Sequence, residues 1–193
     1  MQTNKNFNIP NVLSSLRVIL LPILYIFAFL SMRAEFLVGY ILIGATDALD
    51  GFLARALNQV TRLGKILDTV ADILFYFSTL FFIVFFYPDI IEANTVLLFV
   101  FLGFYLSAYI FSWIKFSKPM QIHTNLLRLN ASFVYFLMIL SHFFDTTYVV
   151  TFILLSFILG YIEELAIFII YGEVDVDTRS IFTLIKKQKE NKH

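Results

Sequence analysis

Residues 46–72 read TDALDGFLARALNQVTRLGKILDTVAD and place four aspartates inside two otherwise apolar segments. Asp47 and Asp50 are three positions apart, and Asp68 and Asp72 are four apart. On α-helices, each pair therefore shares one face. If the two segments are antiparallel helices joined by the short polar stretch, all four carboxylates lie within roughly 10–15 Å of the connected end, at about 1.5 Å per residue.

The composition predicts an integral membrane protein. Sixty per cent of the 193 residues are hydrophobic, 24 are phenylalanine, and the mean hydropathy is +0.83. A water-soluble domain of this size cannot cover so much apolar surface. The net charge of zero gives no indication of a nucleic-acid partner. The absence of cysteine excludes disulfides, thiolate metal sites and a cysteine nucleophile.

The fold expected is an all-α membrane domain with six transmembrane helices. A helix needs about 20 apolar residues to cross the hydrocarbon. The six segments that qualify are residues 12–32, 36–56, 66–87, 95–114, 124–144 and 148–171. The first is expected to be a retained helix and not a cleaved signal. We expect one domain over residues 1–193, in which residues 172–193 form a polar cytoplasmic tail.

The distribution of basic residues predicts the orientation. Thirteen of the fourteen Lys and Arg residues lie on one side of the six predicted spans, and only Arg33 lies on the other. Because positive charge is retained on the cytoplasmic side, both termini should be cytoplasmic. The four aspartates then lie near the cytoplasmic surface. We expect the protein to reside in the plasma membrane, with the site that these aspartates form facing the cytoplasm.

Four carboxylates inside a membrane require compensating positive charge. Each costs at least ~2.5 kcal/mol on insertion scales, and neighbouring carboxylates repel one another. Arg55 alone does not neutralise four. Oxygen ligands without His or Cys favour Mg²⁺, Mn²⁺ or Ca²⁺ over Zn²⁺. The alternative is a buried ion-pair network with Arg55, Arg62 and Lys65.

The same stretch resembles the signature of the CDP-alcohol phosphatidyltransferase family, D-x-x-D-G-x-x-A-R-x8-G-x-x-x-D-x-x-x-D. The matching residues are Asp47, Asp50, Gly51, Ala54, Arg55, Gly64, Asp68 and Asp72. The resemblance implies transfer of a phosphatidyl group from CDP-diacylglycerol to a polar alcohol, with release of CMP. It also implies a homodimer embedded in membrane lipids.

The resemblance further implies a role for each matched residue. The four aspartates would hold two divalent ions, Mg²⁺ or Mn²⁺, and Asp72 would also be the catalytic base that activates the acceptor hydroxyl. The CDP-lipid would be bound by Gly51, Ala54, Arg55 and Gly64.

Residues 8–22 and 54–68 look most similar to phosphatidylglycerophosphate synthases, which implies glycerol 3-phosphate as the acceptor. Thr69 and Ile73 depart from that subfamily, which usually has proline and lysine there. The alternatives are the same chemistry with serine, inositol phosphate or phosphatidylglycerol. A metal-ion transporter is an alternative of another class, although such sites usually lie near the bilayer centre.

A phosphorylated acceptor needs cationic partners, for which Arg62, Lys65 and Arg128 are the candidates. Arg17, in the first predicted span, is interpreted as an anchor that snorkels to the membrane surface. Glu163 and Glu164 interrupt the last span near the depth of the aspartates. Adjacent residues on a helix point in different directions, so we expect at most one of them to face the site and the other to pair with Arg128 or a second subunit.

Overall fold

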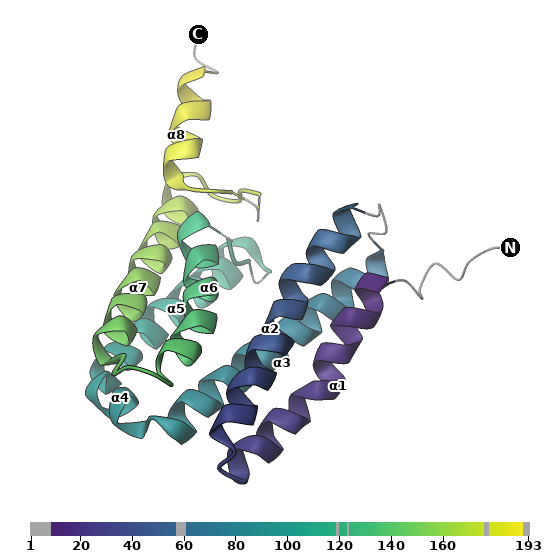
Figure 1. Ribbon diagram of the computed structural model, residues 1–193. Helices are drawn as coiled ribbons and strands as arrows, with labels where there is room; N and C mark the ends of the chain where they lie inside the picture. Colours follow the sequence, from purple (N-terminus) through teal and green to yellow (C-terminus); the bar gives the residue numbers. More distant parts are fainter. Residues whose placement is uncertain (1–8, 57–60, 119, 123, 176–177, 191–193) are drawn as a thin grey trace, which may run out of the picture. The chain divides into compact units, whose positions relative to one another are not determined.

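The computed structural model describes residues 9–56, 61–118, 120–122, 124–175 and 178–190, and over these residues the only regular structure is helical (Figure 1). The chain divides into two compact units, residues 1–87 and 88–193. The elements are α1 (Ile9–Phe29), α2 (Arg33–Ala56), α3 (Arg62–Phe86), α4 (Pro88–Ala93), α5 (Thr95–Phe116), α6 (Asn125–Leu140), α7 (Thr147–Ile170) and α8 (Ile181–Glu190).

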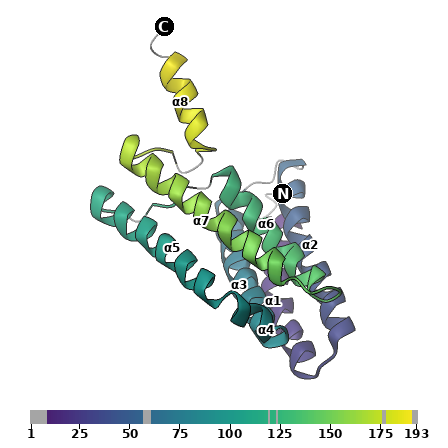
Figure 2. The same cartoon turned by 90° about the vertical axis from the view of Figure 1, so that its left-hand side faces the viewer.

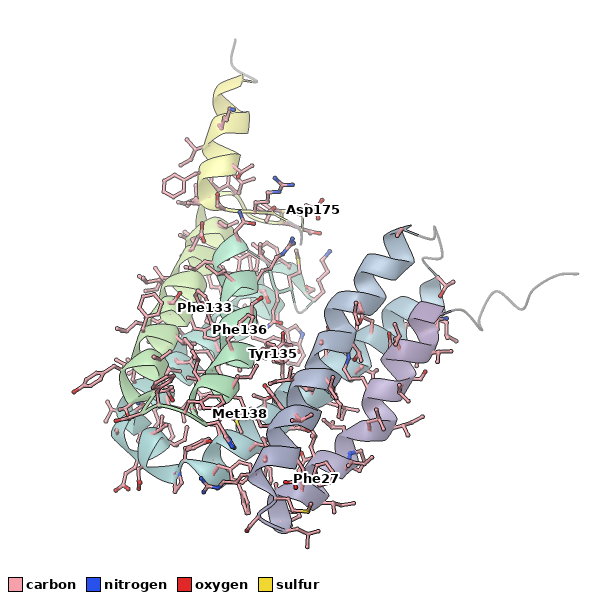
Figure 3. The ribbon with its side chains drawn as sticks, viewed as in Figure 1. Phe27, Phe133, Tyr135, Phe136, Met138 and Asp175 are labelled. Carbon is pink, nitrogen blue, oxygen red and sulfur yellow. The ribbon has the colours of Figure 1, made fainter. Side chains whose placement is uncertain are left out.

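The first unit is a three-helix bundle in which α1 packs against both α2 and α3. Ser31 adopts a left-handed conformation, with φ of 59°, at the reversal between α1 and α2. Gly39 lets these helices approach closely, because a Cβ there would lie 2.9 Å from Leu24 Cδ2. Phe27, near the same reversal, also borders this glycine (Figure 3).

The core of the first unit is aromatic, and two of its tyrosine hydroxyls are hydrogen-bonded to α3. Phe36, Tyr40 and Phe82 are fully buried. The Tyr40 hydroxyl is hydrogen-bonded to Thr79 Oγ1 at 3.0 Å, and the Tyr25 hydroxyl donates to Ser78 Oγ at 2.9 Å. Pairing of this kind is required where hydrocarbon offers no alternative partner. These bonds tie α1 and α2 to α3.

The second unit is built around α7, which packs against α5 and α6 (Figure 2). Ser156 on α7 donates to the buried Asn130 of α6 at 2.8 Å. The α6 face includes the buried Met138, and Phe133 of α6 lies 6.5 Å, centroid to centroid, from Phe152 of α7 (Figure 3). Shortly before α8, the carbonyl of Asp175 accepts from the backbone N–H and the hydroxyl of Thr178 (Figure 3).

Four helical segments are long and apolar enough to cross a membrane: Asn11–Phe29, Ile66–Phe86, Thr95–Phe116 and Thr147–Ile170. The predicted spans at 36–56 and 124–144 overlap α2 and α6, which are not among these four segments. The latter has only 16 residues and ends at Leu140, where Ser141 bonds back to the carbonyl of Leu137 and to Thr146. The predicted tail contains the short helix α8. The prediction of an all-helical chain with several apolar helices is confirmed.

Candidate active site

Asp68 and Asp72 lie one turn apart on α3, as their spacing predicts. The helix begins after Thr61, whose Oγ1 accepts from the backbone N–H of Gly64 at 2.9 Å and so caps the first turn. The Asp68 and Asp72 side chains are 43% and 37% exposed. Two partly open carboxylates therefore mark one face of a helix that is otherwise apolar enough to span a membrane.

Arg17 of α1 binds both of these aspartates. Its side chain is only 2% exposed, and its Nη1 donates to Asp72 Oδ1 at 2.5 Å. Its Nη2 lies 3.7 Å from Asp68 Oδ1. The guanidinium thus faces α3 within the bundle, and the interpretation of Arg17 as a snorkelling anchor is wrong. Three-residue spacing places it on the α1 face that packs against α3.

The face of α1 that carries Arg17 is polar over two turns. Asn11, Ser14 and Arg17 are spaced by three residues, and all three are buried. The side chains of Asn11 and Thr61 lie within hydrogen-bond distance of each other, at 3.3 Å. This spacing was visible in the sequence. A polar stripe within a membrane helix is a candidate for a buried contact, so this signal singles out Arg17 but not its partners.

Gly64 allows α1 and α3 to approach closely at the start of the stripe. A Cβ at this position would lie 2.3 Å from Asn11 Oδ1 and 2.9 Å from Thr61 Oγ1. The signature glycine therefore has a packing role in this structure. Its expected role in binding the CDP-lipid stays a prediction.

The other signature residues lie in the C-terminal part of α2, which is helical through Ala56. Their backbone spacing on a helix is as predicted. Among the residues predicted for the site, several have side chains outside the described part of the structure: Asp47, Asp50, Gly51, Ala54, Arg55, Arg62 and Lys65. His123 also lies outside the described residues.

The described residues of the site fit a divalent cation in their donor chemistry. Asp68 and Asp72 supply carboxylate oxygens, the ligands that Mg²⁺ and Mn²⁺ prefer. Both already gather around a cation, the Arg17 guanidinium. Among the described residues there is no group of three or more potential metal-ligating side chains, so a complete ligand set needs further residues, for which Asp47 and Asp50 are the candidates.

In the second unit, Arg128 lies exposed in the first turn of α6. Glu163 and Glu164 each accept a backbone N–H there. Glu164 is fully buried, and its Oε1 accepts from the N–H of Ile122 at 2.6 Å. Glu163 Oε1 accepts from the N–H of Ile181, the first residue of α8, at 3.0 Å. These two glutamates of α7 thus bind the backbone just before α6 and at the start of α8.

The comparisons with known proteins agree with the signature. The family model for CDP-alcohol phosphatidyltransferase matches residues 7–169. The chain belongs to the CDP-alcohol phosphatidyltransferase family.

Curated proteins are similar to parts of the chain. The CDP-diacylglycerol–glycerol-3-phosphate 3-phosphatidyltransferase of Aquifex aeolicus is 42% identical over 96 residues, which cover 50% of this chain and 53% of the relative. The protein of that name in Pseudomonas fluorescens is 43% identical over 68 residues, 34% of this chain and 35% of the relative. The cardiolipin synthase (CMP-forming) of Streptomyces coelicolor is 40% identical over 89 residues, 42% of this chain and 40% of the relative. The chain spans about half, or less, of the length of these relatives.

Proposed function

We propose that the protein transfers a phosphatidyl group from CDP-diacylglycerol to glycerol 3-phosphate and releases CMP. The observation that carries the proposal is the pair Asp68 and Asp72, held half-exposed on one face of α3 within a stretch that matches the family signature. The names of the Aquifex and Pseudomonas relatives support glycerol 3-phosphate as the acceptor.

The four signature aspartates would together bind two Mg²⁺ or Mn²⁺ ions. Bound there, such ions supply electrostatic stabilisation of the phosphoryl oxygens and of the CMP leaving group. The carboxylate of Asp72 accepts the proton of the acceptor hydroxyl, and its contact with Arg17 orients it for that transfer.

The remaining signature residues would bind the two substrates. Small side chains at Gly51 and Ala54 leave room for the cytidine, and Arg55 and Gly64 complete the CDP-lipid site. A phosphorylated acceptor would be bound by Arg62, Lys65 and Arg128, because guanidinium and ammonium groups form charge-assisted hydrogen bonds with phosphate.

We further propose that the chain is one membrane domain with six spans, both termini in the cytoplasm and the site facing the cytoplasm from the plasma membrane. Four spans have support from length and composition, and the helices α2 and α6 are the candidates for the other two. A homodimer is part of the proposal, on the family resemblance.

A second acceptor has specific support. The Streptomyces relative is named a CMP-forming cardiolipin synthase, which favours a lipid acceptor such as phosphatidylglycerol as the second candidate. The two candidates differ in where the acceptor resides, since glycerol 3-phosphate is water-soluble and phosphatidylglycerol lies in the bilayer.

The test is CMP release by the purified full chain in detergent with CDP-diacylglycerol, Mg²⁺ or Mn²⁺, and one acceptor at a time. Glycerol 3-phosphate, phosphatidylglycerol, serine and inositol phosphate form the panel. Release with glycerol 3-phosphate alone, abolished by chelator, is expected. If CMP is released only with another acceptor, that compound takes the place of glycerol 3-phosphate in the proposal. If folded protein releases no CMP with any acceptor of the panel, the proposal is wrong.

A further inference from the structure

We infer that Arg17 is the counter-cation of the metal-free site, which holds Asp68 and Asp72 together until a divalent cation binds and then releases at least one of them. The inference rests on the proposed metal binding at these aspartates. It assigns to α1 a part in the site that the signature at residues 46–72 does not include.

The geometry shows one cation bridging two anions. The two terminal nitrogens of the guanidinium approach different carboxylates, at 2.5 Å from Asp72 Oδ1 and 3.7 Å from Asp68 Oδ1. The first distance is a short charge-assisted hydrogen bond, and the second is beyond hydrogen-bond range. Arg17 therefore holds Asp72 firmly and Asp68 loosely.

Electrostatics requires such a cation when no metal is bound. Two ionised carboxylates one helical turn apart repel each other, and a low-dielectric surrounding strengthens the repulsion. Arg17 has little contact with solvent and supplies the compensating charge from within the protein. Without this partner, the repulsion between the two partly exposed carboxylates would be uncompensated within the described part of the site.

The same charge opposes an incoming metal ion. A divalent cation held by Asp68 or Asp72 would be close to the guanidinium, and the like charges would repel. A carboxylate oxygen that accepts from Arg17 also has less electron density to donate to a metal. The loosely held Asp68, which is the more exposed of the two, is the carboxylate that Arg17 gives up first.

The packing of α1 on α3 confines this exchange to the side chain of Arg17. Asn11 contacts Thr61 two turns before Arg17, at the point where Gly64 allows the close approach. The two helices are thus joined at this end whether or not Arg17 holds both aspartates. Release of the guanidinium needs a change of rotamer and no movement of α1.

The test combines metal affinity with stability, neither of which requires activity. Mn²⁺ binding to the purified full chain is followed by the electron paramagnetic resonance signal of free Mn²⁺, and thermal unfolding is recorded in EDTA and in saturating Mn²⁺. Arg17→Gln is compared with the wild type. Arg33→Gln is the matched control, because Arg33 is exposed at the opposite end of the bundle.

Arg17→Gln should bind Mn²⁺ more tightly than the wild type, by roughly tenfold, because a repelling charge has been removed. It should unfold at a lower temperature than the wild type in EDTA, and the difference should shrink in Mn²⁺. Arg33→Gln should leave the Mn²⁺ affinity unchanged, and any loss of stability from its contact with the Phe86 ring should be equal in EDTA and in Mn²⁺. Arg17→Lys keeps the charge on a single nitrogen, so it should fold in EDTA and bind Mn²⁺ with an affinity between those of the wild type and Arg17→Gln.

Three results would overturn the inference, and the third would also overturn the metal in the proposed function. If the wild type binds Mn²⁺ and both Arg17 variants bind it equally or more weakly, Arg17 supports the metal site and the counter-cation inference is wrong. An equal loss of stability with and without Mn²⁺ leads to the same conclusion. If the wild type binds no Mn²⁺, the metal in the proposed function is wrong, and the inference falls with it.

Discussion

At the scale of single residues, each carboxylate described inside the apolar helices α3 and α7 has a partner that compensates its charge or donates a hydrogen bond to it. Asp68 and Asp72 are compensated by Arg17, and Glu164 receives a backbone N–H from Ile122. In each case a carboxylate in an apolar helix meets a partner from another part of the same unit. The cost of an ionised group within the membrane makes such partners necessary.

The first prediction concerns the proposed base. Asp72→Asn keeps the size of the side chain but removes its ability to accept a proton, so CMP release should fall at least about 100-fold. Asp89→Asn, at the exposed first turn of α4, is the matched control and should retain wild-type release. Activity of Asp72→Asn within a few-fold of the wild type would exclude Asp72 as the base.

The second prediction concerns Glu164. Glu164→Leu should destabilise the protein by about 1–3 kcal/mol, because the buried N–H of Ile122 would lose its acceptor. Glu164→Gln retains a carbonyl oxygen that can accept from Ile122, so it should lose less stability than Glu164→Leu. Stability would be measured by denaturant unfolding in detergent.

Glu173→Leu provides the comparison for Glu164→Leu. Glu173 pairs with Lys118 at 2.5 Å, but both side chains are more than half exposed, at 55% and 53%. An exposed ion pair of this kind contributes about 0–1 kcal/mol. A larger loss from Glu173→Leu than from Glu164→Leu would contradict the role assigned to burial.

At the scale of elements, the contact between α1 and α3 brings the site together. Asn11, Thr61 and Gly64 join the two helices at one end, and Arg17 meets the aspartates two turns further along α1. A bulkier residue at Gly64 therefore has consequences at Asp72 without touching it.

The third prediction tests this contact. Gly64→Ala would place a Cβ 2.3 Å from Asn11 Oδ1, so α1 must move or the side chain of Asn11 must turn away. We expect a loss of about 1–3 kcal/mol in stability, measured by denaturant unfolding, together with weaker CMP release.

Gly103→Ala is the matched control for Gly64→Ala. This glycine lies within α5, and a Cβ there would meet no atom within 4 Å. Because alanine favours helix by about 1 kcal/mol over glycine, Gly103→Ala should be neutral or stabilising. Asn11→Ala removes the atom that the new Cβ approaches, so the double variant with Gly64→Ala should lose less than the sum of the two single changes.

At the scale of the whole molecule, the number of spans decides which side of the membrane each connection occupies. Six spans place residues 88–94 outside and residues 117–123 inside. If only the four helices that are most clearly long and apolar crossed, both connections would change sides. Residues 145 and 173 lie outside and inside, respectively, in both arrangements.

The fourth prediction uses the absence of native cysteine in the chain. In spheroplasts that express single-cysteine variants, a membrane-impermeant maleimide should label Glu92→Cys directly and label Ser117→Cys only after permeabilisation. Asp145→Cys and Glu173→Cys are the outside and inside controls. The reverse pattern at residues 92 and 117, with correct controls, would establish four spans.

The sequence by itself determined the helical membrane class, the family and the shared face of Asp68 and Asp72. These depend on composition and on the helical period, which are local properties. Only the tertiary structure decided that Arg17 turns inward to these aspartates, that Gly64 meets Asn11, and that Glu163 and Glu164 hold backbone N–H groups. The physical reason is that a polar residue on a membrane helix has the same pattern whether it faces a headgroup or a neighbouring helix. The rotation and close packing of the helices select its partner.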